Sequence, residues 1–235
     1  MKKKCNISAS SGFTFFVLSF VTILLFSACS KNNDVTPQIP AAGLMAFNLA
    51  PDKPSIGFTV SGSQITNVGL NYTGYTGQYV AVSPGTRELV SFDFAGGSTI
   101  KTSNHVFEDS SYYSVFLLGA NGQYNHVFAK DNFDAIAPVS GKAWVRYINA
   151  IADTSVRPNV TIGSVTEGAV FGTITPFVQV NAGSLTAAIS IENVTRTITV
   201  EENKIYTILF VGLTNQTNPA LAPQVKFIVN GSASN

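Results

Sequence analysis

The sequence predicts an all-β protein with two tandem β-sandwich domains that follow a signal peptide. Three observations lead to this prediction. One pattern occurs twice in the last ~190 residues. Segments inside each copy alternate apolar and polar residues, which is typical of strands with one buried face. The first 28 residues have the composition of an export signal.

The chain opens with three lysines near its start, followed by an apolar stretch over about residues 13–26. As a helix, these 14 residues would span about 21 Å, whereas the hydrocarbon core of a bilayer is ~30 Å thick. The stretch is short for a membrane-spanning helix and suits the core of a signal peptide. We therefore expect residues 1–28 to be a signal peptide, with an uncleaved anchor helix as the alternative.

The end of this stretch resembles a bacterial lipobox. Ser27 and Ala28 precede Cys29, and Phe26 stands where such boxes usually carry Leu, Val or Ile. In a lipobox the cysteine is lipidated on sulfur and becomes the new N-terminus, so the resemblance implies lipidation of Cys29. Ser30 follows in place of Asp, which favours the outer membrane under Gram-negative sorting rules. We expect an outer membrane lipoprotein, on the periplasmic face or the cell surface.

Residues 29–42 are expected to be the lipidated cysteine and a flexible tether, because SKNNDVTPQIPAA is polar, contains two prolines and has no periodicity. The leader holds three lysines and no acidic residue, so the rest keeps 11 basic against 13 acidic residues, a net charge near −2. No basic face remains for nucleic acid. The expected partner is the membrane, through the lipid anchor. The other cysteine lies in the leader, so no disulfide is expected.

The rest of the chain is a repeat. The segments that begin at residues 46, 78 and 107 match, in the same order, segments that begin about 100, 98 and 93 residues later. The matched pairs are AFNLAPDKPSIGFTVSGS with RYINAIADTSVRPNVTIGS, QYVAVSPGTRELVSFDF with PFVQVNAGSLTAAISIE, and FEDSSYYSVFLLG with VEENKIYTILFVG. We predict two copies, residues 43–138 and 141–235, joined at a Pro- and Gly-containing segment.

Each copy is predicted to be a β-sandwich. In RELVSFDF, Val90, Phe92 and Phe94 alternate with polar residues and are expected to form the buried face. YYSVFLLG and YTILFVG are apolar on both faces and are expected to be central strands. Several short strands in each ~95 residues, separated by Gly, Pro and Asn, are typical of a sandwich.

These segments resemble the domain of unknown function numbered 4397, which occurs in tandem in many secreted and lipid-anchored bacterial proteins. The stretches that carry the resemblance are NLAPDKPSIGFTVSGSQI, YVAVSPGTRELVSF, KDNFDAIAPVSGKAWVRYINAIADT and YTILFVGL. The resemblance implies two Ig-like β-sandwiches and export. It implies no chemistry and no cofactor.

Candidate catalytic residues have simpler interpretations. No GxSxG or HExxH motif accompanies His105 and His126, which we expect on strand surfaces. The acidic pairs at 108–109 and 201–202 fall at the same place in each copy, which favours solvated turns over a glycosidase pair. KDNFDA, residues 130–135, lacks the frame of a calcium loop and is expected to be a polar turn between the domains.

The candidate binding residues are Tyr72 and Tyr75, in the loop NYTGYTGQY. Tyrosines among glycines can form a stacking platform for sugars or a protein contact. The alternative is that both pack on the rim of the sandwich. Tyr79 aligns with Phe177 and is expected to point inward at the start of the next strand.

The sequence therefore predicts a non-enzymatic, lipid-anchored cell-envelope protein that acts as a binding or structural module. Its expected partner is an envelope protein or a polysaccharide. One alternative is a carbohydrate-binding accessory lipoprotein that uses Tyr72 and Tyr75 as contacts. A hydrolase is the less favoured alternative.

Overall fold

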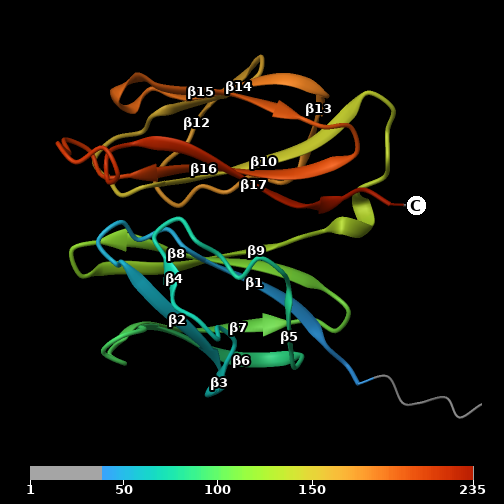
Figure 1. The fold of residues 1–235 in the computed structure, drawn as a ribbon. Helices are drawn as coiled ribbons and strands as arrows, with labels where there is room; N and C mark the ends of the chain where they lie inside the picture. The colour runs from blue at the N-terminus through green and yellow to red at the C-terminus, as the bar shows by residue number, and fades with distance from the viewer. Residues whose placement is uncertain (1–38, 235) are drawn as a thin grey trace, which may run out of the picture. The chain divides into compact units, whose positions relative to one another are not determined.

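The computed structural model describes residues 39–234, and residues Pro40–Asn235 form one compact unit. The predicted signal peptide, Cys29 and nearly all of the predicted tether lie outside the described residues. Strands account for most of this unit, with short 3-10 turns at Phe133–Ala135 and Ile191–Asn193 (Figure 1). Within residues 39–234, no helix is long and apolar enough to cross a membrane.

The first half of the unit contains two sheets. The inner sheet has the order β5-β1-β8-β9, and the outer sheet has the order β3-β2-β6-β7, with β4 also paired to β2. The strands are β1 (Ala42–Asn48), β2 (Ser55–Val60), β3 (Ser63–Gln64), β4 (Leu70–Asn71), β5 (Val80–Val82), β6 (Gly85–Asp93), β7 (Thr99–Phe107), β8 (Tyr112–Ala120) and β9 (Gln123–Lys130).

The second half repeats this arrangement. Its inner sheet has the order β13-β10-β16-β17, and its outer sheet has the order β12-β11-β14-β15. The strands are β10 (Lys142–Ile151), β11 (Asn159–Ile162), β12 (Val165–Gly168), β13 (Val178–Asn181), β14 (Gly183–Ile189), β15 (Val194–Val200), β16 (Lys204–Gly212) and β17 (Gln224–Ser232). The all-β sandwich prediction is confirmed. That each half folds by itself stays a prediction.

The central strands of the two inner sheets are equivalent. β1 pairs with β8 in parallel, and β10 pairs with β16 in parallel, while the remaining ladders are antiparallel. One parallel pair in each inner sheet differs from the wholly antiparallel sheets of a typical Ig-like sandwich. The segments YYSVFLLG and YTILFVG lie in β8 and β16, in the interior of their sheets, as the sequence predicts.

Each half has its own hydrophobic core between its two sheets. In the first half, Leu44, Phe58 and Leu117 are fully buried there. In the second half, Ile208 and Phe210 occupy the corresponding core. Burying a side chain of this size contributes roughly 1.5–3 kcal/mol, so each sandwich has a substantial source of stability of its own.

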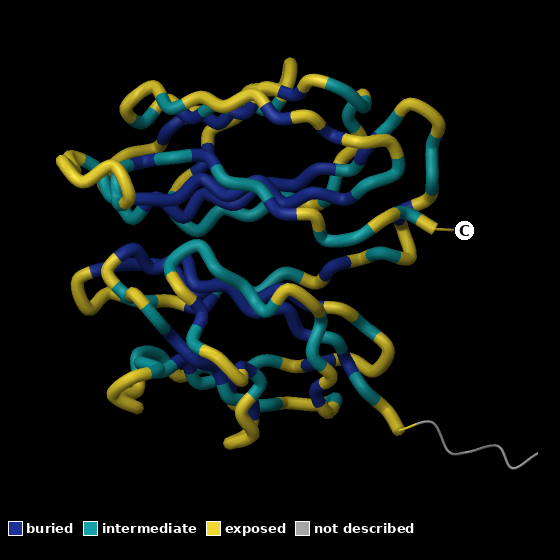
Figure 2. Tube along the Cα trace, viewed as in Figure 1, coloured by how far each residue is buried: buried dark blue, intermediate teal, exposed yellow. Residues whose placement is uncertain are grey.

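A third cluster lies between the two inner sheets, and we call it the interface cluster. Along β8, Val115 and Leu117 face the first core, whereas Phe116 and Leu118 face the interface cluster. This explains why the central strands are apolar on both faces and are buried along almost their whole length (Figure 2). The buried members of the interface cluster are Met45, Phe47, Leu49, Phe116, Leu118, Ile148, Ala150, Leu209, Val211 and Ile228.

The predicted buried face of β6 is wrong. Leu89 and Ser91 are fully buried and point to the first core, whereas Phe92 is half-buried on the opposite face. Phe92 stacks on Phe94 with ring centroids 6.2 Å apart. A Cβ on Gly57 would lie 2.3 Å from the Phe92 ring. The glycine thus lets the phenylalanine cover the outer face of the sheet, and the polar Ser91 takes the inward place.

Candidate functional site

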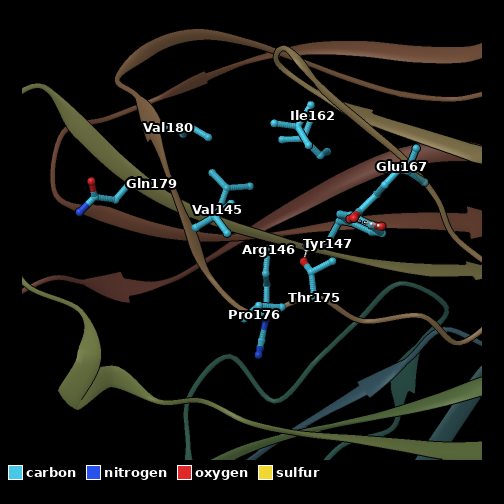
Figure 3. Close-up of a pocket in the computed structure, with 12 residues that line it drawn as sticks. Val145, Arg146, Tyr147, Ile162, Glu167, Thr175, Pro176, Gln179 and Val180 are labelled. Carbon is cyan, nitrogen blue, oxygen red and sulfur yellow. Dashed lines mark hydrogen bonds between the residues drawn. The ribbon is translucent and has the colours of Figure 1, made fainter.

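A cleft of about 310 Å³ opens between the sheets of the second half (Figure 3). The strands that border it, β12 and β13, are the terminal strands of their sheets. Side chains on β10 and β11 close the inner end. Most of its lining is aliphatic, and these residues are Val145, Val160, Ile162, Val165, Pro176, Val178 and Val180.

Alternate residues of β12 face the cleft, and β13 contributes two valines to its lining. Val165 and Glu167 line it, whereas Thr166 lies on the other face of β12, where its hydroxyl is 2.9 Å from that of Thr161. Val165 is 63% exposed, and on β13 Val178 is 51% exposed. The mouth of the cleft is therefore an apolar surface open to solvent.

One polar pair stands among the aliphatic walls. The Tyr147 hydroxyl donates a hydrogen bond of 2.7 Å to Glu167 Oε1. Burial, followed by this bond to Glu167, raises the pKa of Tyr147, so the phenol keeps its proton and remains a donor. The Thr175 hydroxyl accepts from the Tyr147 backbone N–H at 3.1 Å. The side chain of Arg146 points away from the cleft (Figure 3).

The Tyr147–Glu167 pair belongs to the second copy alone. Ile162 pairs with Val165 as Val60 pairs with Ser63 in the first copy. The same register places Ile65 where the second copy has Glu167. The first-copy cleft is smaller, about 210 Å³, and its lining includes the polar residues Ser61, Ser63, Ser83 and Arg87. The sequence analysis did not predict this site. Aligning the two copies strand by strand would have set Glu167 of the second copy against Ile65 of the first, and this difference was the available signal.

Tyr72 and Tyr75 pack against the interface cluster. Tyr75 stacks on Phe47 with ring centroids 5.3 Å apart. Burial raises the pKa of Tyr72, and its buried hydroxyl has no hydrogen-bond partner among residues 39–234. An isolated β-bridge joins Phe47 to Tyr75 in the first copy, and an equivalent one joins Ile148 to Ile174 in the second. The corresponding loops of the two copies therefore pair with their inner sheets in the same way. The structure thus brings the two tyrosines together as packing residues between the halves.

The segment KDNFDA contains a buried, hydrogen-bonded aspartate that the sequence analysis did not predict. Asp131 is 2% exposed and accepts hydrogen bonds of 2.6 Å from the hydroxyls of Tyr79 and Ser114. It also forms an ion pair with Arg146. Asn132 and Asp134 are exposed, as a polar turn predicts. Within residues 39–234, no group of three potential metal ligands occurs. The sequence did contain one signal for this ion pair, because Arg146 is a charged residue inside the mostly apolar strand AWVRYINAI and would need a partner when buried.

Comparison with known proteins identifies the family. A family model described as "Domain of unknown function (DUF4397)" matches residues 42–163, which span the whole first half and β10–β11 of the second. The chain belongs to this family. The resemblance seen in the sequence is therefore confirmed. No curated protein matches this DUF4397 chain.

One similar solved structure comes from work on alpha-glucan recognition by family 41 carbohydrate-binding modules from streptococcal virulence factors. It is 13% identical, and the match covers 81% of this chain and 97% of that chain with a TM-score of 0.24. At this level of likeness, nothing about the ligand of this DUF4397 chain follows from it.

The predicted surface position of His126 is wrong. His126 is 7% exposed. Its Nδ1 lies 2.8 Å from Ser103 Oγ and its Nε2 lies 3.0 Å from Ser91 Oγ. Burial, with a smaller effect from Lys101, lowers the pKa of His126 to about 4. Ser91 is fully buried, so this Ser–His–Ser chain of hydrogen bonds satisfies polar groups inside the first sandwich.

His105 is half-buried on β7. Its ring stacks on that of Phe128 with centroids 4.0 Å apart, and burial lowers its pKa. The acidic pairs lie in turns that precede the central strands. The backbone N–H groups of Glu108 and Glu201 donate to the hydroxyls of Tyr113 and Tyr206, at 3.1 and 2.9 Å. These acids thus have equivalent structural places in both copies.

Proposed function

We propose that this DUF4397 chain is a non-enzymatic, lipid-anchored cell-envelope protein that works as a binding module, with the cleft of the second sandwich as its ligand site. The observation that supports this most is the open aliphatic cleft with a polar pair, Tyr147 and Glu167, found in one copy and not in the other.

The physical cost of the cleft supports a binding role. Aliphatic surface left in water forgoes the stabilisation that its burial gives, roughly 25 cal/mol per Å². The first copy limits this cost with a smaller cleft whose lining includes serines and Arg87. The second keeps Val165 and Val178 exposed at the mouth of a larger one. A volume of about 310 Å³ lies at the lower end of the ~300–1,000 Å³ typical of ligand sites.

The non-enzymatic part of the proposal is supported by the placement of the candidate catalytic groups. Ser91, the serine hydrogen-bonded to His126 Nε2, has no exposed surface. The acidic pair at Glu108 lies in an exposed turn, where Glu108 forms an ion pair with Lys130. The buried serine gives a substrate no access, and the Glu108 carboxylate is held by Lys130 in an exposed turn, so a binding role is favoured over hydrolysis.

The anchor is proposed from the sequence, and Cys29 tests it. Cys29→Ala should abolish incorporation of labelled fatty acid and leave an uncleaved precursor in the inner membrane. The measurement is fatty-acid labelling with fractionation of the two membranes. Normal maturation and outer-membrane location of the Cys29→Ala protein would show that there is no lipid anchor.

The binding site is tested in cells with a photo-crosslinking amino acid, p-benzoylphenylalanine, in place of Val178. The control position is Val106, which is 58% exposed on β7 of the first half. Illumination should give a covalent adduct from position 178 and none from position 106, read by the mass of the isolated full chain. Absence of an adduct at position 178, or the same adduct at both positions, would remove the cleft as the ligand site.

A carbohydrate-binding accessory role is the second candidate, because one pocket near the segment between the halves has aromatic walls. This pocket is about 310 Å³ and includes Phe128, Trp144 and Phe177 together with Lys130 and Asn132. Aromatic faces beside hydrogen-bonding side chains suit sugar rings. Affinity electrophoresis in gels that contain cell-envelope polysaccharides tests this role. Retardation that Trp144→Ala abolishes would favour it over the cleft, and unretarded migration would exclude it for those polysaccharides.

A further inference from the structure

The outer edge of β12 has no strand beside it within the described part of the chain. β12 is the terminal strand of its sheet and pairs with β11 alone. All four residues of β12, from Val165 to Gly168, are exposed. An edge strand of this kind presents a row of backbone N–H and C=O groups, which can form a ladder with an extended segment of another chain.

The inward face of β12 sets the chemistry that such a segment needs. In a sheet, side chains directly opposite one another on neighbouring strands share a face. A residue opposite Val165 would therefore face the cleft and should be aliphatic. A residue opposite Glu167 would face a carboxylate and should be basic. The two ion pairs among residues 39–234 are Lys130–Glu108 and Arg146–Asp131, and neither involves Glu167.

The equivalent edge of the first half does not offer this combination. Its strand, β3, has only the two residues Ser63–Gln64. Beyond it, the Thr66 hydroxyl accepts a hydrogen bond of 3.0 Å from the Phe58 N–H, and Thr66 is buried. The cleft there has Ile65 at the position of Glu167, and the charged residue in its lining is Arg87. A basic, aliphatic strand would meet a short edge and a positive charge, so the site is specific to the second half.

We propose that an extended polypeptide segment of a partner adds to the free edge of β12 as a further strand, with a basic residue opposite Glu167 and aliphatic residues two positions away from it. This inference rests on the proposed binding function and names the class of ligand for the same cleft. The added strand would close the mouth of the cleft and cover Val165 and Val178. Backbone hydrogen bonds to the edge supply affinity, and the paired side chains supply specificity.

A designed peptide tests the proposal with the full chain in detergent. The probe is a fluorescein-labelled Thr-Val-Thr-Lys-Thr-Val-Thr amide, whose valines flank the lysine on both sides so that either strand direction fits. A second probe carries Glu in place of Lys. A third carries N-methyl groups on alternate peptide nitrogens, in two versions that block either set of edge hydrogen bonds. Fluorescence anisotropy measures the binding of each probe.

The Lys probe should bind about tenfold more tightly than the Glu probe, because a like charge opposite Glu167 is unfavourable. Glu167→Lys should reverse this preference, and Glu167→Gln should reduce it. Glu88→Lys, at an exposed position on β6 of the first half, is the matched control and should leave it unchanged. One of the two N-methylated versions should lose binding.

Three results would overturn the strand proposal: no binding of the Lys probe, no effect of Glu167→Lys on the preference, or full binding of both N-methylated versions. Circular dichroism shows in each case that the variant is folded. The crosslinking experiment at position 178 distinguishes a failure of the strand proposal from a failure of the proposed binding function. An adduct there without peptide binding leaves the cleft as a site for another kind of ligand, whereas absence of both removes the cleft altogether.

Discussion

Asp131 and Arg146 form an ion pair whose side chains are 0% and 2% exposed. Asp131 follows β9 at the end of the first sandwich, and Arg146 lies on β10 of the second. The Arg146 guanidinium also donates 2.9 Å hydrogen bonds to the hydroxyls of Thr207 and Ser114. The pair therefore connects the inner sheets of both halves at the edge of the interface cluster.

Arg146→Met should destabilise the protein by about 3–5 kcal/mol, because it leaves the buried Asp131 carboxylate without its counter-charge. Methionine is the matched choice, since Met45 occupies the position in the parallel ladder of β1 with β8 that Arg146 occupies in the ladder of β10 with β16. Urea denaturation measures the change. The double variant Arg146→Met with Asp131→Asn should recover more than half of the loss. A double variant as unstable as the single one would mean that packing, and not the unpaired charge, causes the effect.

Replacing Tyr72 and Tyr75 together by alanine should lower stability by about 2–5 kcal/mol, since large-to-small changes leave cavities in the interface cluster. Tyr72→Phe is the control. It should be neutral or slightly stabilising, because the Tyr72 hydroxyl is buried without a partner in the described chain and an unsatisfied group costs free energy. Differential scanning calorimetry measures both. An unchanged melting temperature in the alanine variant would return the tyrosines to the surface role that the sequence suggested.

Stability should fall as the pH drops from about 6.5 to about 4. The pKa of His126 is about 4 in the folded protein and about 6.5 in the unfolded chain. Between these pH values His126 is protonated in the unfolded chain and neutral in the folded protein. The free energy of unfolding therefore falls by about 3 kcal/mol by pH 4, and by little more at lower pH. Chemical denaturation at several pH values measures this slope. His126→Gln should flatten it, and an equally steep slope in that variant would assign the effect to other groups.

Gly119→Ala and Gly212→Ala should each cost more than about 2 kcal/mol, because backbone strain adds to a steric overlap. These equivalent glycines, near the ends of β8 and β16, have φ values of +110° and +132°. An added Cβ would lie 1.9 Å from the Gln123 carbonyl oxygen and 2.5 Å from that of Ala222. Gly62→Ala, with φ +80° and open space, should cost only about 1 kcal/mol. Thermal unfolding compares the three, and equal costs would exclude the overlap as the cause.

A fragment of residues 141–235 should fold, since it contains a complete core of its own, and should then self-associate. Removal of the first half exposes Ile148, Leu209 and Val211 on the inner sheet, and a contiguous apolar patch promotes association. Circular dichroism with analytical ultracentrifugation measures both properties. A fragment that folds only when residues 43–138 are added would show that the two halves are a single folding unit.

The sequence by itself determined the repeated all-β architecture, because the signals involved are local. Strand alternation is a property of consecutive residues, as in RTITVE, where Ile198 and Val200 are buried as their period of two predicts. The glycines at 119 and 212 mark backbone conformations that other residues avoid. The repeat showed the same signals twice, so the strands could be predicted from the sequence, and the family was predicted from the resemblance of these segments to a known domain.

The tertiary structure alone decided what each strand face and loop packs against. The pattern of RELVSFDF is compatible with either face inward, and in the folded protein the inward Ser91 shares a hydrogen bond with His126 on another strand. The loop of Tyr72 and Tyr75 has the composition of a binding loop, yet both tyrosines are half-buried against the interface cluster. The Tyr147–Glu167 pair joins residues 20 positions apart. These contacts are set by how whole sheets stack, and the order of residues along a single strand does not identify which residues of another sheet cover it.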